Sequence, residues 1–163
     1  MSITSRSLVR IAVLALGPIV AIAPALAQSA HIVVPADKVQ WSPAPPVLPA
    51  GAQLSVLEGN PAEKGALTLR LKLPANYEIP AHWHSMTERV TVMSGAFHVG
   101  MGNKLEREKT QLLQPGGFVS LPAKMNHFAW TSAPTIVQIN LEGPFDIFYV
   151  NPADNPQQTL TKK

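Results

Sequence analysis

Residues 81–88 read Ala-His-Trp-His-Ser-Met-Thr-Glu, and the interpretation of the whole chain starts from this stretch. In an extended strand, side chains i and i+2 point to the same face, so His82 and His84 project together. The residues between His84 and Glu88 are enough for a short turn that brings the carboxylate alongside the two rings. The stretch therefore predicts three ligands for one metal ion. A mixed set of nitrogen and oxygen ligands suits Fe, Mn, Ni, Co or Zn.

Short apolar runs separated by turn residues surround this stretch. Residues 67–73 read Leu-Thr-Leu-Arg-Leu-Lys-Leu, an unbroken alternation that predicts a strand with one buried face. Comparable runs occupy residues 54–57, 89–93, 96–101, 118–121, 128–131, 135–141 and 145–150. Many short strands at close spacing indicate an all-β sandwich or barrel. The charged segment 104–114 is expected to be a loop or an irregular strand.

The dipeptide Ser94-Gly95 predicts a two-residue hairpin turn that pairs residues 90–93 with residues 96–99. In this hairpin Glu88 shares a face with apolar residues only, namely Val90, Val92, Phe97 and Val99, while His98 lies on the opposite face. A lone carboxylate on an apolar face is costly unless it is neutralised or bound to a cation. The pattern therefore favours Glu88 as a ligand.

The fourth ligand has to come from the three remaining histidines of the five in the chain. His31 lies in a proline-rich segment and His98 on the outer face, and each is interpreted as an ordinary exposed side chain. His127 opens a predicted strand in which Ala129 and Thr131 share its face. Small neighbours leave room for a bound ligand, so His127 is the candidate.

With these residues identified, the sequence resembles the cupin family. The first cupin motif is a glycine, five residues, His-x-His, three or four residues, Glu, six residues and Gly. The matching residues are His82, His84, Glu88 and Gly95. The second motif is a glycine, five residues, Pro-x-Gly, two residues, His, three residues and Asn. The matching residues are Gly116, Pro122 and His127.

Three positions depart from the cupin motifs, with Asn76 and Lys124 in place of glycine and Thr131 in place of asparagine. Asn76 is a mild departure, and Lys124 is expected to reshape its turn. Four further segments are similar to those of small exported single-domain cupins, namely residues 57–59, 92–97, 100–102 and 149–154.

The resemblance implies an antiparallel double-stranded β-helix, the cupin or jelly-roll barrel. It also implies a homodimer and one divalent metal ion, identified only as Fe, Mn, Zn or Ni. The implied metal ligands are His82, His84, Glu88 and His127.

The chain is expected to consist of one domain with three flanking segments. Residues 1–27 have the basic start, the short apolar run and the Ala25-Leu26-Ala27 site of a secretory signal peptide. The alternatives for this segment are an uncleaved anchor and a buried helix. Residues 28–50 form a proline-rich arm that is either disordered or docked, residues 51–150 the barrel, and residues 151–163 a polar tail. This organisation predicts a periplasmic or secreted protein with no membrane contact after cleavage.

Composition excludes several classes of function. The chain contains no cysteine, which rules out disulfides, thiolate ligands and a cysteine nucleophile. The formal charge of +3 falls to +1 without Arg6 and Arg10 of the signal peptide, so it gives little support for a nucleic-acid partner.

The leading hypothesis is a metal-dependent, dioxygenase-like enzyme that acts on a small organic substrate, because this ligand set leaves coordination positions open. One alternative is a non-oxidative cupin lyase, decarboxylase or isomerase. Another is a metal- or ligand-binding module without catalysis. No residue beyond the metal ligands is assigned a catalytic role, since a cupin barrel does not select among these chemistries.

Overall fold

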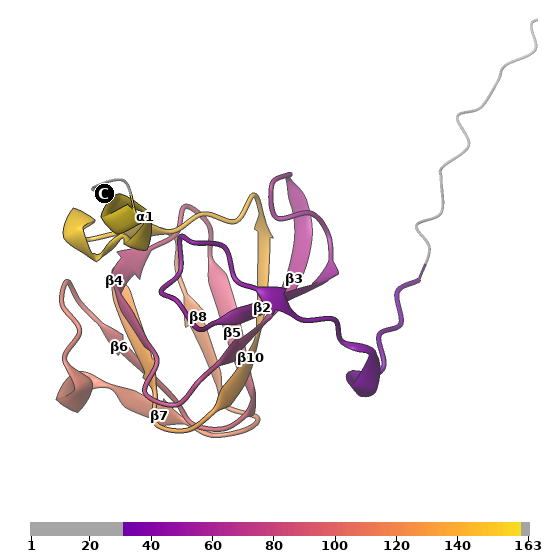
Figure 1. Ribbon diagram of the computed structural model, residues 1–163, viewed down its shortest axis with the longest axis horizontal. Helices are drawn as coiled ribbons and strands as arrows, with labels where there is room; N and C mark the ends of the chain where they lie inside the picture. Colours follow the sequence, from indigo (N-terminus) through magenta and orange to yellow (C-terminus); the bar gives the residue numbers. More distant parts are fainter. Residues whose placement is uncertain (1–30, 161–163) are drawn as a thin grey trace, which may run out of the picture. The chain divides into compact units, whose positions relative to one another are not determined.

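The computed structural model describes residues 31–160, so the predicted signal peptide lies outside the described residues. The strands within this range form two antiparallel sheets around one hydrophobic core (Figure 1). The six-stranded sheet contains, in spatial order, β1 (Ser42–Pro43), β2 (Gln53–Glu58), β3 (Gly65–Leu73), β10 (Thr135–Gly143), β5 (Glu88–Ser94) and β8 (Phe118–Leu121). The five-stranded sheet contains β11 (Phe148–Tyr149), β4 (Glu78–Trp83), β9 (His127–Thr131), β6 (Phe97–Met101) and β7 (Gln111–Leu113). This arrangement confirms the predicted all-β barrel of jelly-roll type.

The six-stranded sheet contributes a continuous aliphatic surface to the core. The alternation predicted for residues 67–73 is observed in β3, where each leucine is buried and the intervening residues face outward. β10 pairs with β3 over its full length, from Leu73 opposite Thr135 to Gly65 opposite Gly143. The inward residues of β10 are equally apolar, so this pair of strands forms the centre of the core.

The predicted hairpin between residues 90–93 and 96–99 is wrong, because these two strands do not pair with each other. The prediction of which side chains face the core is confirmed. β5 pairs with β10 and β8, whereas β6 pairs with β9 and β7, so the chain crosses between sheets at Gly95. Gly95 has φ +85°, and a Cβ there would lie 2.3 Å from the Pro134 carbonyl oxygen. The crossing therefore depends on a close backbone approach that only glycine allows. Glu88 and its apolar neighbours nevertheless all point inward.

The second half of the proline-rich arm lies against the barrel. β1 pairs with β2, and the Trp41 ring lies 5.5 Å from the ammonium nitrogen of Lys72. Leu48 is inserted into the hydrophobic core. By contrast, residues 32–34 at the start of the described chain are exposed.

Helical structure in the described range is confined to short segments. They are η1 (Ala36–Lys38), η2 (Arg107–Lys109), η3 (Pro152–Asp154) and α1 (Pro156–Leu160). The charged segment 104–114 thus contains η2 and the edge strand β7. Within residues 31–160, no helix has the length and apolar character needed to cross a bilayer.

Candidate metal centre

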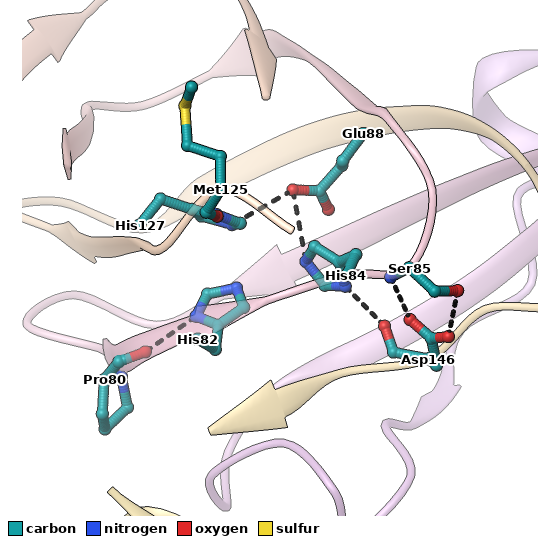
Figure 2. A network of polar contacts seen from close by, with 8 residues as sticks. All are labelled: Pro80, His82, His84, Ser85, Glu88, Met125, His127 and Asp146. Atoms are coloured by element: carbon teal, nitrogen blue, oxygen red, sulfur yellow. Dashed lines mark hydrogen bonds and ion pairs between the residues drawn. The ribbon is translucent and has the colours of Figure 1, made fainter. Parts of the chain in front are cut away.

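Four side chains named from the sequence lie together inside the barrel. His82 belongs to β4, His84 follows that strand directly, Glu88 begins β5 and His127 begins β9. All four are buried. One ligand atom from each histidine lies within 4.8 Å of the others, and Figure 2 shows the three rings and the carboxylate gathered on one side of the strands.

A bulge in β4 turns the histidines inward. Ile79 lies opposite Ala129 and His82 lies opposite His127, so β4 has one residue more than β9 between these two pairs. The extra residue shifts the alternation, and Ile79 and His82 both face the core. Pro80 lies inside the bulge, and a proline within a strand is typical of such sites. Sequence reasoning missed this signal.

The histidine rings are oriented by backbone carbonyl groups. His82 Nδ1 lies 2.7 Å from the carbonyl oxygen of Pro80, and His127 Nδ1 lies 2.9 Å from that of Met125. His84 Nδ1 contacts the carbonyl oxygen of Asp146 (Figure 2). A carbonyl oxygen only accepts, so each Nδ1 is the donor. The neutral ring then has a free lone pair on Nε2.

Two of these lone pairs accept no hydrogen bond in the described part of the chain. The Nε2 atoms of His84 and His127 are buried and make no hydrogen bond. Buried polar atoms are almost always satisfied, and metal-bound histidines in proteins commonly donate the other ring nitrogen to a carbonyl. The orientation therefore fits a metal ion bound through Nε2.

Glu88 completes the set from the opposite sheet. Its Oε2 lies 3.5 Å from His84 Nε2 and 3.6 Å from His127 Nε2. Two ligand atoms, each about 2.1 Å from one ion, lie roughly 3 to 3.5 Å apart, so small movements suffice for shared coordination. Glu88 is not a member of the three-histidine group defined above, and it lies beside two of its members.

The charge states also suit a divalent cation. Burial, together with the neighbouring His127 and His84 rings that disfavour another positive charge, lowers the pKa of His82 to about 3. Burial raises the pKa of Glu88, but the contact with His127 and the charges of the histidines outweigh burial, so its pKa lies below the usual value. A neutral His82 ring and an ionised carboxylate are therefore expected at neutral pH.

A strap formed by residues 144–148 secures the turn between the ligands. Besides the carbonyl contact with His84, Asp146 accepts through Oδ1 from the Ser85 amide at 2.8 Å, and its Oδ2 accepts from the Ser85 hydroxyl. Asp146 thus holds one ligand and the residue after it. Sequence reasoning missed Asp146, because nothing in residues 144–148 indicates which distant turn they contact.

The candidate ligands line a small and otherwise apolar cavity of about 30 Å³. Its apolar wall consists of Leu48, Leu71, Leu73, Ile79, Val90, Phe97, Val99, Leu121, Ala129, Val137, Ile139, Phe145 and Ile147. Ala129 is among them, as expected from the small residues on the face of His127. Within residues 31–160, the four ligand candidates are the only polar side chains that line this cavity.

Comparison with known proteins agrees with this geometry. The family model described as the ChrR cupin-like domain matches residues 29–144. The chain belongs to this cupin family. None of the curated proteins matches the sequence.

Solved structures similar to this cupin have diverse functions. The polyketide cyclase RemF from Streptomyces resistomycificus has a TM-score of 0.64 at 13% identity and covers 81% of this chain and 94% of its own. A proposed acetylacetone dioxygenase from Methylibium petroleiphilum has a TM-score of 0.61 at 19% identity, and the match covers 80% of this chain and 88% of the dioxygenase chain. The DMSP lyase DddQ from Ruegeria pomeroyi has a TM-score of 0.54 at 18% identity, and the match covers 68% of this chain and 60% of the lyase chain. At these identities the likeness shows the fold alone.

The departures from the cupin motifs preserve the backbone of the turns. Asn76 and Lys124 have φ of 58° and 62°, the left-handed conformation that glycine adopts readily, so the expectation that Lys124 reshapes its turn is wrong. The Lys124 amide donates to the His84 carbonyl at 2.8 Å, which connects the two motifs. The Thr131 hydroxyl, fully buried, donates to the Pro74 oxygen and accepts from the Tyr77 amide.

The remaining histidines and polar candidates of this cupin lie away from the cavity. His31 is exposed, as expected, whereas His98 is half-buried and stacks on Trp130 with ring centroids 3.9 Å apart. Tyr77, Glu78, Lys124 and Asn126 are near the motifs in sequence, yet none of them lines the cavity. The structure therefore adds no proton-transfer residue to the four candidate ligands.

Proposed function

We propose that this cupin is a metal-dependent, dioxygenase-like enzyme that acts on a small, largely apolar molecule with an oxygen able to coordinate the metal. One observation carries the proposal: three histidines and a carboxylate, with two Nε2 atoms that make no hydrogen bond, line a cavity whose other walls are apolar. His82, His84, Glu88 and His127 would hold the ion. A divalent metal there would supply Lewis-acid activation of a coordinated oxygen and, as Fe(II), reactivity with dioxygen.

The protein's own residues restrict the substrate. The described cavity wall offers no arginine or lysine to pair with a phosphate or a second carboxylate. A buried charge without a partner is strongly disfavoured, so such substrates are excluded by desolvation. Small enolisable diketones and phenols satisfy these limits.

The same wall favours oxidative chemistry over the lyase and isomerase alternatives. Reactions that relocate protons need a positioned acid or base. Among the described residues that line the cavity, only the four candidate ligands titrate. A substrate that binds as an enolate or phenolate needs no further proton carrier before it reacts with oxygen.

The test is anaerobic loading with Fe(II), followed by measurement of oxygen uptake and product formation with acetylacetone and catechol. The proposal expects oxygen consumption in proportion to product, its loss in His127→Ala and its retention in His98→Ala. Product without oxygen uptake would assign the protein to the non-oxidative cupins instead.

A non-catalytic metal-binding module is the second candidate, and the size of the cavity favours it. About 30 Å³ holds roughly one or two water molecules, far less than a substrate needs. This candidate expects tight metal retention with neither oxygen uptake nor product. A metal-loaded protein that binds no exogenous ligand at the metal would decide in its favour.

Export and dimerisation also stay proposals. A mature protein that begins at Gln28, isolated from the periplasm or the medium and identified by intact mass, is the expected result of signal cleavage after Ala27. Light scattering of that protein tests the dimer. A chain that retains its first 27 residues in the membrane fraction would favour the uncleaved anchor.

A further inference from the structure

The cavity of about 30 Å³ is too small for a substrate, which raises the question of which part of its wall moves when a ligand enters. Most apolar wall residues belong to strands and are held by the hydrogen bonds of the two sheets. Leu48, Phe145 and Ile147 are the described exceptions, because they lie outside the strands. The moving wall is therefore the arm that carries Leu48 or the strap that carries Phe145 and Ile147.

The strap is tied to the metal centre. Asp146 lies between Phe145 and Ile147, accepts from the ring of His84 and fixes Ser85. Displacement of the strap would release the ring of a candidate ligand. It would thus disrupt the centre that an entering molecule has to reach.

Among residues 31–50, the arm makes no hydrogen bond to a candidate ligand; it is joined to Tyr149, which lies opposite His82 in the neighbouring strand. The Leu48 side chain is held in place by hydrogen bonds to the two flanking carbonyl groups, from the Tyr149 hydroxyl to Val47 at 2.8 Å and from the Tyr77 hydroxyl to Pro49. Prolines lack an amide hydrogen, so the arm around Leu48 has few donors with which to join a sheet. Besides these two bonds, the arm around Leu48 has backbone bonds from the Leu48 amide to Pro45 and from the Ala44 amide to Ala52, both at 3.0 Å, so local opening breaks fewer bonds than separation of two strands.

Leu48 is shared by the cavity and an outside groove. It lines the metal cavity, and it also lines a groove of about 340 Å³. The groove is formed by Pro43, Ala44, Pro46, Pro49, Ala50, Gly51, Ala52 and Pro156 together with Leu48. Several of these residues are exposed, so the groove communicates with solvent.

We propose that Leu48 is the specificity-determining wall of the metal cavity. A ligand reaches the metal when Leu48 moves toward the groove, and the size of the side chain at this position sets the largest ligand that binds. This inference rests on the proposed function, because it requires a metal that accepts an exogenous ligand.

Ligand binding to the Co(II)-loaded full chain tests the size limit. Azide is the small probe and 4-nitrocatechol the large one, both followed by the visible absorption of the complex. Leu48→Ala should bind 4-nitrocatechol about tenfold more tightly than the unmodified protein, and Leu48→Phe about tenfold more weakly, with azide affinity unchanged. Leu67→Ala is the matched control, because Leu67 is buried in β3 and does not line the cavity.

The outcomes separate the two proposals. Equal 4-nitrocatechol affinity in Leu48→Ala, Leu48→Phe and the unmodified protein, with azide binding intact, overturns the role of Leu48 and leaves the proposed function standing. Failure of azide to bind to any Co(II)-loaded form overturns the proposed function and this inference with it.

Thiol labelling tests the movement without metal. The chain contains no cysteine, so Leu48→Cys and Leu67→Cys each introduce a single thiol. The thiol at position 48 should react with iodoacetamide at least about tenfold faster than that at position 67, because local opening requires less free energy than global unfolding. Tyr149→Phe in the Leu48→Cys background should raise the rate further. Equal rates at positions 48 and 67 would show that the arm opens only with the whole fold, and would overturn the proposal.

Discussion

The two sheets of the barrel have different inner faces. The six-stranded sheet presents regular aliphatic rows from β3 and β10, and Glu88 is its single contribution to the candidate metal centre. The five-stranded sheet has a bulge in β4, three histidines close together and the small residue Ala129. Apolar burial is concentrated in one sheet and the buried nitrogen atoms in the other. Burial of the aliphatic rows on one wall can therefore offset the cost of ring nitrogens without hydrogen bonds on the other.

Loss of a ligand from the five-stranded sheet should have the largest effect. His82→Ala is expected to weaken metal binding by about a thousandfold, since a four-ligand zinc site contributes roughly 10 to 16 kcal/mol in total. Competition with a chromogenic chelator measures the affinity. His98→Ala, on the outer face of the same sheet, is the control and should bind metal as the unmodified protein does. Equal affinities in both variants would contradict the ligand assignment.

A cavity in the six-stranded sheet should reduce stability without affecting the metal. Leu69 is 1% exposed and lies opposite Ile139 in the ladder of β3 and β10. Leu69→Ala is expected to lower the free energy of unfolding by about 3 kcal/mol. Urea denaturation of the metal-free protein measures this loss. A large drop in metal affinity in the same variant would show that the two sheets do not divide their roles.

Removal of the Asp146 side chain should weaken metal binding to an intermediate extent. Asp146→Ala deletes both contacts with Ser85 but keeps the carbonyl group that orients His84. Changes around metal-bound histidines typically reduce affinity 10- to 100-fold, and we expect about tenfold here. Ser85→Ala removes only the hydroxyl contact and should have the smaller effect. A greater loss of metal affinity in Ser85→Ala than in Asp146→Ala would show that Asp146 does not hold the turn between His84 and Glu88.

The smallest effect is expected at a turn of the second cupin motif. Lys124 has φ 62°, which is unfavourable for a residue with a Cβ by roughly 1 to 2 kcal/mol. Lys124→Gly should therefore stabilise the metal-free protein by about 1 kcal/mol, whereas Lys124→Ala retains the unfavourable φ and should change little. Thermal unfolding of the two variants side by side measures the difference. Equal melting temperatures would remove backbone strain as the explanation.

Much of the fold and the candidate site could be predicted from local sequence pattern. Strict alternation identifies β3, and the i, i+2 spacing places His82 and His84 on one face, because these features depend on neighbouring residues only. The pairing of β5 with β10 instead of β6 could not be read from the Ser94-Gly95 turn. That choice is made by contacts of Gly95 with the segment around Pro134, which is distant in sequence.

The supporting contacts of the site were missed for a related reason. Pro80 offered a local signal of the bulge in β4, and the signal was overlooked. Asp146 and Leu48 offered none, because each acts on a part of the chain far away in sequence. A motif locates the candidate ligands, whereas the cavity wall at Leu48 and the hydrogen bonds from Asp146 depend on tertiary structure.

The pairing of β3 with β10 also determines when the centre can form during folding. Leu73 pairs with Thr135 and Gly65 with Gly143, so all four candidate ligands lie in the part of the chain enclosed between these two strands. Closing so long a loop is entropically unfavourable, and folds dominated by distant pairings are slow to form. A chain that ends before residue 135 would contain every candidate ligand and no barrel to hold them. Metal acquisition is therefore expected to follow closure of the β3–β10 ladder, late in the folding of the chain.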